Sequence, residues 1–300
     1  MSATATIVGA SGRLGLELCE VLCGEREIRG LSRTRPRTVA GWDWEPAELL
    51  SLEEIQRVPQ PSDNLVIYSA GLVGHQECEA RPELAKALNC DIPERIAQRC
   101  QEQGTRFVYL STDAVFGGEE GNYSESDPTA PFSEYGRSKL AGENAVLASC
   151  EHALVIRTNF FGWFGEGRRS ILDFFAKRLE AGVKCQGYED YVVSSAYVAP
   201  VAEALRDLLA RDVAGVVHVA SHDAASKFDF GVRVARALGV SESLVERASV
   251  PESAGVGGSK DLSLNCALAE SLLGRPLTTL DDDLARAISD HAVAVQGQPQ

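Results

Sequence analysis

Tyr135 and Lys139 are the residues of this chain whose types and spacing point most directly to chemistry. They stand at i and i+4 in the segment YGRSK, so on a helix both side chains share one face. A tyrosine with an ordinary pKa of about 10 gives up its proton too rarely at pH 7 to be a good acid–base group. A neighbouring ammonium stabilises the phenolate and lowers that pKa, so the pair predicts a tuned proton donor. The same spacing also fits an aromatic packing residue beside a surface lysine.

A second chemical feature is the glycine-rich turn near the start of the chain. Gly9, Gly12 and Gly15 follow a β-branched run, Thr4–Val8, and open a helical pattern over Leu14–Cys23. A pyrophosphate needs backbone that can approach closely and a helix N-terminus that offers N–H groups. The turn therefore predicts a dinucleotide site formed by Gly9, Ser11, Gly12, Arg13, Leu14 and Gly15. A strand-to-helix turn that binds nothing is the alternative.

The end of the second predicted strand, Glu27–Ser32, bears on which dinucleotide is bound. An acid there would hydrogen-bond the adenosine ribose 2′-hydroxyl, but the segment reads GLSRTRPR and has none. Ser32 and Arg33 could instead hold a 2′-phosphate. This favours NADP(H) over NAD(H), the alternative being a solvated basic loop.

Two hydroxyls close a further apolar run in FVYLSTDAVFGG. Ser111 and Thr112 fall where the carboxyl ends of parallel strands open a cofactor crevice. Thr112 could hold a carbonyl oxygen against Tyr135.

The elements that must position these residues alternate between strand and helix. Further apolar runs stand at Leu65–Ser69, Arg106–Ser111, Ala153–Arg157 and Val213–Val219, with helical patterns at Ala80–Gln103, Tyr135–Ala148 and Tyr197–Leu209. This predicts an α/β fold, a Rossmann-type doubly wound parallel sheet with a smaller interleaved C-terminal substrate domain. We expect the dinucleotide-binding domain over 1–160 with 190–235 returning to it, the substrate domain over 161–189 and 236–292, and a frayed tail over 293–300. A glycine-rich loop is expected at 253–258.

The composition excludes several classes of partner. The 300 residues are 44% hydrophobic and carry a formal charge of −14, which repels nucleic acid and anionic membrane. No apolar run is long enough to span a bilayer and no export signal precedes the first strand, so a cytoplasmic protein is expected. The eight cysteines are scattered, and we expect them to be reduced.

Other candidate centres lack the residues they would need. His218 and His222 span a strand end and a loop, and His75 and Cys78 lack further ligands, so no metal site is predicted. No GxSxG elbow suggests a hydrolase.

Taken in order, these segments resemble the short-chain dehydrogenase/reductase family. The closer resemblance is to its extended branch and the dTDP-4-dehydrorhamnose reductase group. STDAVFGG is similar to that group's STDxVFxG segment and YGRSKLAGE to its YGxSKLxGE segment, and the likeness covers nearly the whole chain. It implies catalytic roles for Thr112, Tyr135 and Lys139, cofactor contacts for Tyr135 and Lys139, and substrate contacts for Thr112 and Asp113.

The resemblance also implies roles in less closely matching segments. In SAGLVGHQECEARPELAKALNCDIPERIA it places Ala70 and Gly71 against the nicotinamide ribose and gives Asn89 a supporting role toward a water or the lysine. In RTNFFGW it places Asn159 near the carboxamide and Phe160 in the substrate pocket, although these aromatics fit a core cluster equally well. Arg168, Arg169 and Lys184 could face a nucleotide diphosphate or solvent. The resemblance allows a homodimer.

The resulting hypothesis is NADPH-dependent reduction of a ketone, the keto group of a nucleotide-linked deoxysugar. One alternative is a nucleotide-sugar epimerase or dehydratase with bound NAD, which the acid-free second strand and Ala114 disfavour. Another is a non-catalytic NADP-binding regulatory subunit.

Overall fold

The computed structural model describes residues 4–164, 170–251 and 260–296. The chain divides into two compact units, the first formed by residues 1–117, 125–158 and 202–218 and the second by 118–124, 159–201 and 219–300. The predicted loop over 253–258 and the pair Arg168 and Arg169 lie outside the described residues.

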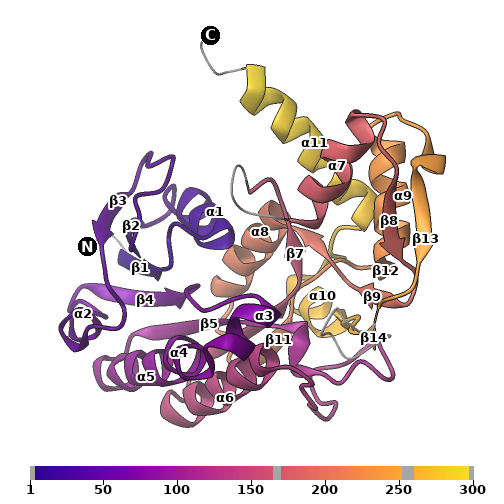
Figure 1. The fold of residues 1–300 in the computed structure, drawn as a ribbon. Coiled ribbons are helices and arrows are strands. Elements are labelled where there is room, and N and C mark those ends of the chain that lie inside the picture. The colour runs from indigo at the N-terminus through magenta and orange to yellow at the C-terminus, as the bar shows by residue number, and fades with distance from the viewer. Residues whose placement is uncertain (1–3, 165–169, 252–259, 297–300) are drawn as a thin grey trace. The chain divides into compact units, whose positions relative to one another are not determined.

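Unit 1 is built on a seven-stranded sheet in which every neighbouring pair is parallel (Figure 1). The strands are β1 (Thr4–Val8), β2 (Glu27–Ser32), β3 (Asp43–Pro46), β4 (Asp63–Tyr68), β5 (Arg106–Thr112), β6 (Leu154–Thr158) and β11 (Gly215–His218). Their order is β11-β6-β5-β4-β1-β2-β3. This confirms the predicted doubly wound fold. The order reverses between β1 and β4, the point where such sheets open a crevice at their carboxyl ends.

Helices cover both faces of this sheet. On the face opposite α1 (Arg13–Leu22), the helices α2 (Leu52–Gln56), α5 (Ile92–Gln103) and α6 (Glu134–Ser149) pack onto strand residues such as Tyr68, Phe107 and Tyr109 (Figure 1). The burial of this apolar surface is what drives the layers together.

The long helix predicted over Ala80–Gln103 is divided into several pieces. They are α3 (His75–Ala80), α4 (Pro82–Lys86), the π-helical turn η1 (Ala87–Asp91) and α5. Prolines explain the breaks, because Pro82 and Pro93 have no N–H to donate within the helix. The turn η1 contains Asn89.

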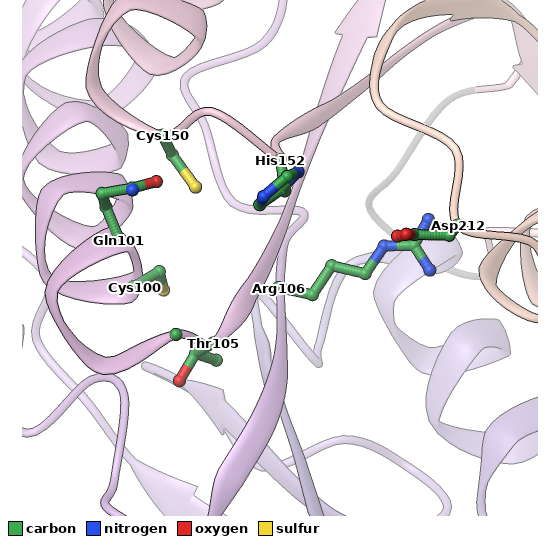
Figure 2. A pocket seen from close by; sticks show the side chains of 8 residues that line it. Cys100, Gln101, Thr105, Arg106, Cys150, His152 and Asp212 are labelled. Carbon is green, nitrogen blue, oxygen red and sulfur yellow. The ribbon is translucent and has the colours of Figure 1, made fainter.

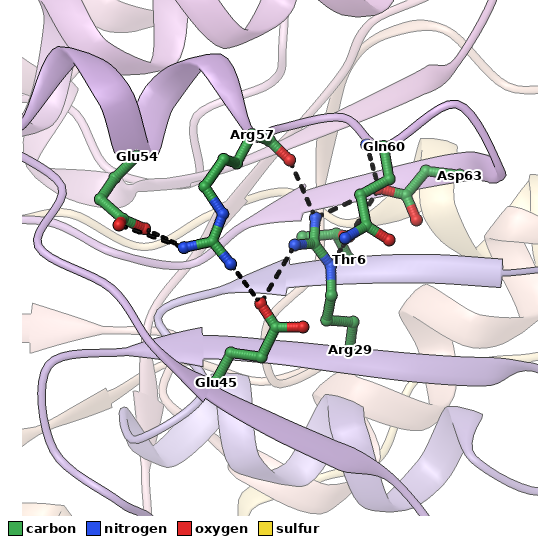
Figure 3. Close-up of polar contacts among 7 residues, drawn as sticks. All are labelled: Thr6, Arg29, Glu45, Glu54, Arg57, Gln60 and Asp63. Atoms are coloured by element: carbon green, nitrogen blue, oxygen red, sulfur yellow. Dashed lines mark hydrogen bonds and ion pairs between the residues drawn. The ribbon is translucent and has the colours of Figure 1, made fainter.

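Arg29 is a charged residue in the middle of β2, and its charge is paired. Its Nε donates to Thr6 Oγ1 at 3.1 Å, and Thr6 donates to Asp63 Oδ2 at 2.6 Å (Figure 3). Glu45 of β3 accepts from Arg29 at 3.5 Å and from Arg57 at 2.9 Å. The network explains how β2 carries a buried guanidinium, since buried charges require partners.

Unit 2 contains short strands in three small sheets. They are β7 (Phe160–Phe161) with β10 (Ala196–Tyr197), β9 (Tyr191–Val193) with β12 (Ala225–Ser226) and β14 (Lys260–Asp261), and β8 (Cys185–Tyr188) with β13 (Val245–Ala248). The helices of unit 2 are α7 (Ile171–Glu180), α9 (Lys227–Ala237), η3 (Glu242–Leu244), α10 (Ala267–Leu273) and α11 (Leu280–Gln296). Helix α8 (Val198–Leu209) contains a unit boundary, and the short turn η2 (Asp113–Val115) belongs to unit 1. Helix α11 continues to Gln296, into the stretch predicted as a frayed tail. Among the described residues, no helix combines the length and hydropathy needed to cross a bilayer.

Candidate active site

The glycine turn after β1 leaves no room for side chains. Gly9 has a φ of +95°, and its N–H donates to Leu31 O at 2.7 Å, while Gly12 N–H donates to Gly9 O at 2.8 Å. A Cβ on Gly15 would lie 2.3 Å from Gly9 O, and one on Gly9 would lie 2.6 Å from Ala70 N. No side chain caps the start of α1. A backbone cradle at an uncapped helix N-terminus fits the pyrophosphate of a dinucleotide.

The other residues predicted around this turn are placed as follows. Arg13 pairs with Glu17 at 2.8 Å, Leu14 is buried in the core, and Ser11 is half-buried. Ala70 is half-buried and Gly71 is exposed directly after β4, on the strand that neighbours β1. The turn and the segment after β4 are therefore brought together at one edge of the sheet.

Ser32 and Arg33 differ in what they can offer a ligand. The Ser32 hydroxyl donates to Thr34 O at 2.9 Å and accepts from Trp44 Nε1 at 2.9 Å, and the residue is buried. Arg33 is exposed. Ser32 thus shapes the loop after β2, whereas the guanidinium of Arg33 remains accessible to a phosphate.

Asn89 holds the loop after β4 against α6. It is fully buried, and its Oδ1 accepts from Leu72 N at 2.9 Å. Its Nδ2 donates to Leu72 O and to Ser138 Oγ, both at 3.0 Å. A Cβ on Gly71 would lie 2.6 Å from Asn89 Oδ1. The amide therefore sets the position of Gly71.

Thr112 and Tyr135 meet at the carboxyl end of β5. Thr112 Oγ1 donates to Asp113 Oδ1 at 2.9 Å and accepts from Ala114 N at 3.2 Å, and its side chain hydrogen-bonds the Tyr135 hydroxyl. Helix α6 is brought close here, because a Cβ on Gly136 would lie 2.1 Å from Ala114 O. The two hydroxyls that were expected to act on one carbonyl oxygen therefore lie next to each other.

The pKa of Tyr135 differs from the sequence-based expectation. The surrounding protein desolvates the hydroxyl and raises its pKa, against a smaller lowering by the hydrogen bond with Thr112. Lys139 was expected to lower this pKa, so that expectation is corrected: desolvation outweighs the stabilising groups. The phenol is therefore protonated at neutral pH, as it would be at its ordinary pKa.

Lys139 is buried one helical turn after Tyr135. Its Nζ donates to Leu110 O at 2.5 Å. Burial lowers its pKa to about 7. Electrostatic interactions with Glu143 on α6 and Cys78 on α3 act in the opposite direction. The ammonium and the neutral amine are therefore close in free energy near neutral pH.

This lowered pKa predicts a pH-dependent stability. The unfolded lysine titrates at about 10.4, so between pH 7 and about that value the unfolded chain binds a proton that the folded chain lacks. From pH 7 to pH 9 the free energy of unfolding of the parent should therefore rise relative to Lys139→Met, by about 2–3 kcal/mol. Urea unfolding at both values measures it, with Lys184→Met on the exposed surface as the control. If the difference in unfolding free energy between the parent and Lys139→Met were the same at both pH values, the lowered pKa of Lys139 would be refuted.

A buried charged network, which was not predicted from the sequence, lies beside these residues. Glu143, at i+4 from Lys139, pairs with Arg157 at 2.7 Å, and each side chain is at most 5% exposed. Ser111 donates a short hydrogen bond to the same carboxylate, and Arg157 lies 3.5 Å from His218 Nε2. The sequence feature that could have indicated this network is a charged residue inside each of two otherwise apolar segments, LAGENAV and LVIRT.

Asn159 and Phe160 lie in unit 2, at the start of β7. Asn159 Oδ1 accepts from Ser195 Oγ at 2.8 Å, and Phe160 packs edge-on to Phe164 with ring centroids 6.5 Å apart. Both side chains are half-buried. Lys184, also in this unit, pairs with Glu246 at 2.7 Å.

A pocket of about 220 Å³ lies at the opposite, amino-terminal edge of the unit 1 sheet (Figure 2). It is lined by residues that include Cys100, Cys150 and His152. Arg106 in its wall donates to Leu209 O at 2.7 Å and Val213 O at 2.8 Å, which ties down the chain before β11. The pocket is therefore separate from the edge that holds the glycine turn and Thr112.

Neither a metal cluster nor a disulfide marks the described part of the chain. No group of three or more His, Cys, Asp or Glu is placed there to hold a metal ion. All eight cysteines are free thiols.

Comparison with known proteins identifies the family. The family described as RmlD substrate binding domain matches residues 4–293. The chain belongs to the RmlD family. This confirms the resemblance found in the sequence and makes the protein an NAD(P)-dependent reductase of the extended short-chain dehydrogenase/reductase type.

Relatives of this RmlD-family chain cover most of its length. The probable low-salt glycan biosynthesis reductase Agl14 of Haloferax volcanii is 33% identical over 82% of this chain and 86% of its own. The dTDP-4-dehydrorhamnose reductase of Mycobacterium tuberculosis is 34% identical over 74% and 71%. A dTDP-4-dehydrorhamnose reductase of Bacillus anthracis, solved with NADP, shares the fold with a TM-score of 0.82 at 23% identity, covering 97% and 100% of the two chains.

Proposed function

We propose that this protein reduces the keto group of a nucleotide-linked 4-keto-deoxysugar with NADPH. The observation that carries the proposal is the hydrogen bond that pairs the Thr112 side chain with the Tyr135 phenol. Both stand at the carboxyl end of β5, next to Lys139. The names of the relatives support the substrate class, since several are dTDP-4-dehydrorhamnose reductases.

The residues of the site divide the tasks of the proposed reaction among them. When bound, the reduced nicotinamide supplies the hydride that adds to the carbonyl carbon. Thr112 orients and polarises the carbonyl oxygen, and Tyr135 donates its phenolic proton to that oxygen as the negative charge develops. Lys139 would hydrogen-bond the nicotinamide ribose and would stabilise the phenolate that remains. In the structure the Thr112 hydroxyl donates to Asp113 at 2.9 Å, so it would turn that proton to the carbonyl oxygen when the substrate binds. Asp113 and, in unit 2, Phe160 carry the substrate contacts that the family resemblance implies.

The cofactor preference rests on the loop after β2. With no acid there and Ser32 already engaged, Arg33 is the group that would bind a 2′-phosphate. The turn residues Gly9 to Gly15 would hold the pyrophosphate. Ala70, Gly71 and, through Gly71, Asn89 would border the nicotinamide end. Asn159 of unit 2 carries the carboxamide contact that the family resemblance implies.

A single assay tests substrate and cofactor together. Purified protein supplied with dTDP-4-dehydrorhamnose should consume NADPH in a one-to-one ratio with the reduced sugar, and more efficiently than NADH. In Arg33→Ala, kcat/KM for NADPH should fall about 10–100-fold, the loss expected for a hydrogen bond to a charged group, while that for NADH changes little. Tightly bound NAD with no net consumption of NADPH would instead indicate an epimerase or dehydratase. A stoichiometric protein partner and silence across keto sugars would indicate a regulatory subunit.

A further inference from the structure

Two buried tyrosines stand side by side on neighbouring strands of unit 1. Tyr68 of β4 and Tyr109 of β5 occupy the same register position, and their rings stack with centroids 6.2 Å apart and an angle of 22°. Both side chains are fully buried. Each therefore needs a partner for its hydroxyl.

The partners are two carbonyls of the turn η1. Tyr68 Oη donates to Leu88 O at 2.8 Å, and Tyr109 Oη donates to Asn89 O at 2.6 Å. In a regular helix Asn89 O would accept from residue 93, but that residue is a proline. Ile92 N–H, which would serve Leu88 O, donates to Ala87 O in the π-helical turn. The tyrosines thus donate to two carbonyls whose regular i+4 donors are a proline or are engaged elsewhere.

Tyr109 contacts the lysine of the site with the face of its ring. The Lys139 Nζ lies 4.0 Å from the centroid of the Tyr109 ring, within the range of a cation–π interaction. The same ammonium donates to Leu110 O at 2.5 Å, next along the strand. The other groups that act on it are Glu143 and Cys78. Burial disfavours the ammonium, and the ring face opposes that effect.

We propose that Tyr109 is a positioning residue for Lys139: its hydroxyl, anchored on Asn89 O, fixes the ring, and the face of that ring holds the ammonium form of the lysine. The inference rests on the proposed function, in which Lys139 serves the cofactor and Tyr135. Helix α6 completes the arrangement at Gly142, where a Cβ would lie 2.0 Å from Asn89 O and 2.6 Å from Tyr109 Oη. Asn89 then supports Lys139 indirectly, because its carbonyl accepts the hydrogen bond that fixes Tyr109.

The proposal is tested by measuring the Lys139 ammonium directly. The chain has six lysines, so labelling the full protein with [ε-13C]lysine gives a simple spectrum in which Lys139→Met identifies one signal. In Tyr109→Leu the pKa of Lys139 should fall by about one unit, the equivalent of a buried cation–π contact. In Tyr109→Phe, which keeps the ring face, it should move much less. Tyr68→Leu is the matched control, because it removes an equally buried stacked ring and an equivalent hydrogen bond.

A second variant covers the case in which Tyr109→Leu does not fold. Trifluorophenylalanine at position 109 keeps the shape of phenylalanine but weakens the negative face of the ring, so it should shift the Lys139 titration downward relative to Tyr109→Phe. An unchanged Lys139 titration in this variant, or an equal shift in Tyr68→Leu, would overturn the proposal.

Kinetics separate this inference from the proposed function. With dTDP-4-dehydrorhamnose and NADPH, the variants that lower the pKa of Lys139 should lose kcat at a lower pH than the parent does. Full turnover in Lys139→Met would refute the catalytic assignment, while the spectra would still decide whether Tyr109 holds the ammonium.

Discussion

Replacing Tyr135 by phenylalanine is expected to lower kcat about 10²–10⁴-fold, the usual contribution of a positioned general acid. The phenol is the group that Thr112 holds at the carboxyl end of β5, and it is protonated through neutral pH. Phenylalanine keeps the ring and removes only the proton donor. The affinity for NADPH, measured by fluorescence titration, should change little, because the pyrophosphate cradle is made by the turn after β1.

The pH profile gives an independent check on this assignment. Since desolvation raises the pKa of Tyr135 above its ordinary value, protonation of the phenol should not limit kcat between pH 6 and pH 9. Tyr123→Phe serves as the control, because Tyr123 is a buried tyrosine of unit 2 whose hydroxyl accepts from Gly118 N and Glu120 N. Turnover at the parent rate in Tyr135→Phe, with intact cofactor binding, would refute the proton-donor role.

The parts of the fold that could be predicted are those set by local pattern. The bounds predicted for β1 and β2 are those found, and the glycine turn between them follows from steric demands that only glycine meets. Strand β3, with the sequence DWEP, carries no alternating pattern and is held at the edge of the sheet by pairing with β2. It could therefore not be predicted.

The parts of the site that were missed depend on contacts between distant segments. For example, Tyr109 donates to the carbonyl of Asn89. This contact depends on the helix break at Pro93, on the register of β4 against β5, and on the close approach of α6 at Gly142. The Tyr-x-x-x-Lys spacing correctly indicated a shared helix face, but it carried no information on desolvation. This is why the direction of the Tyr135 pKa shift came out opposite to the expectation.

The second large effect is expected from the ion pair between Glu143 and Arg157. Glu143 is 1% exposed and accepts from Arg157 Nε and Nη2 at 2.7–3.2 Å, so Glu143→Leu leaves a buried guanidinium without its carboxylate. Removing one partner of such a pair costs about 3–5 kcal/mol of unfolding free energy. Urea unfolding measures this loss. Glu246→Leu, which breaks the exposed pair with Lys184, should leave the free energy of unfolding nearly unchanged.

The double variant Glu143→Leu/Arg157→Met distinguishes the value of the pair from the cost of an orphaned charge. Because two apolar side chains of similar size need no desolvated partner, the double variant should recover most of the stability lost in Glu143→Leu. Ser111 would still lack its acceptor, and Arg157 also stacks on Phe116 at 5.0 Å, so recovery should be incomplete. If the double variant were no more stable than Glu143→Leu, the loss would come from packing and not from charge. Because Glu143 also acts on Lys139 from the same helix, the recovered variant should fold and still titrate Lys139 at lower pH than the parent.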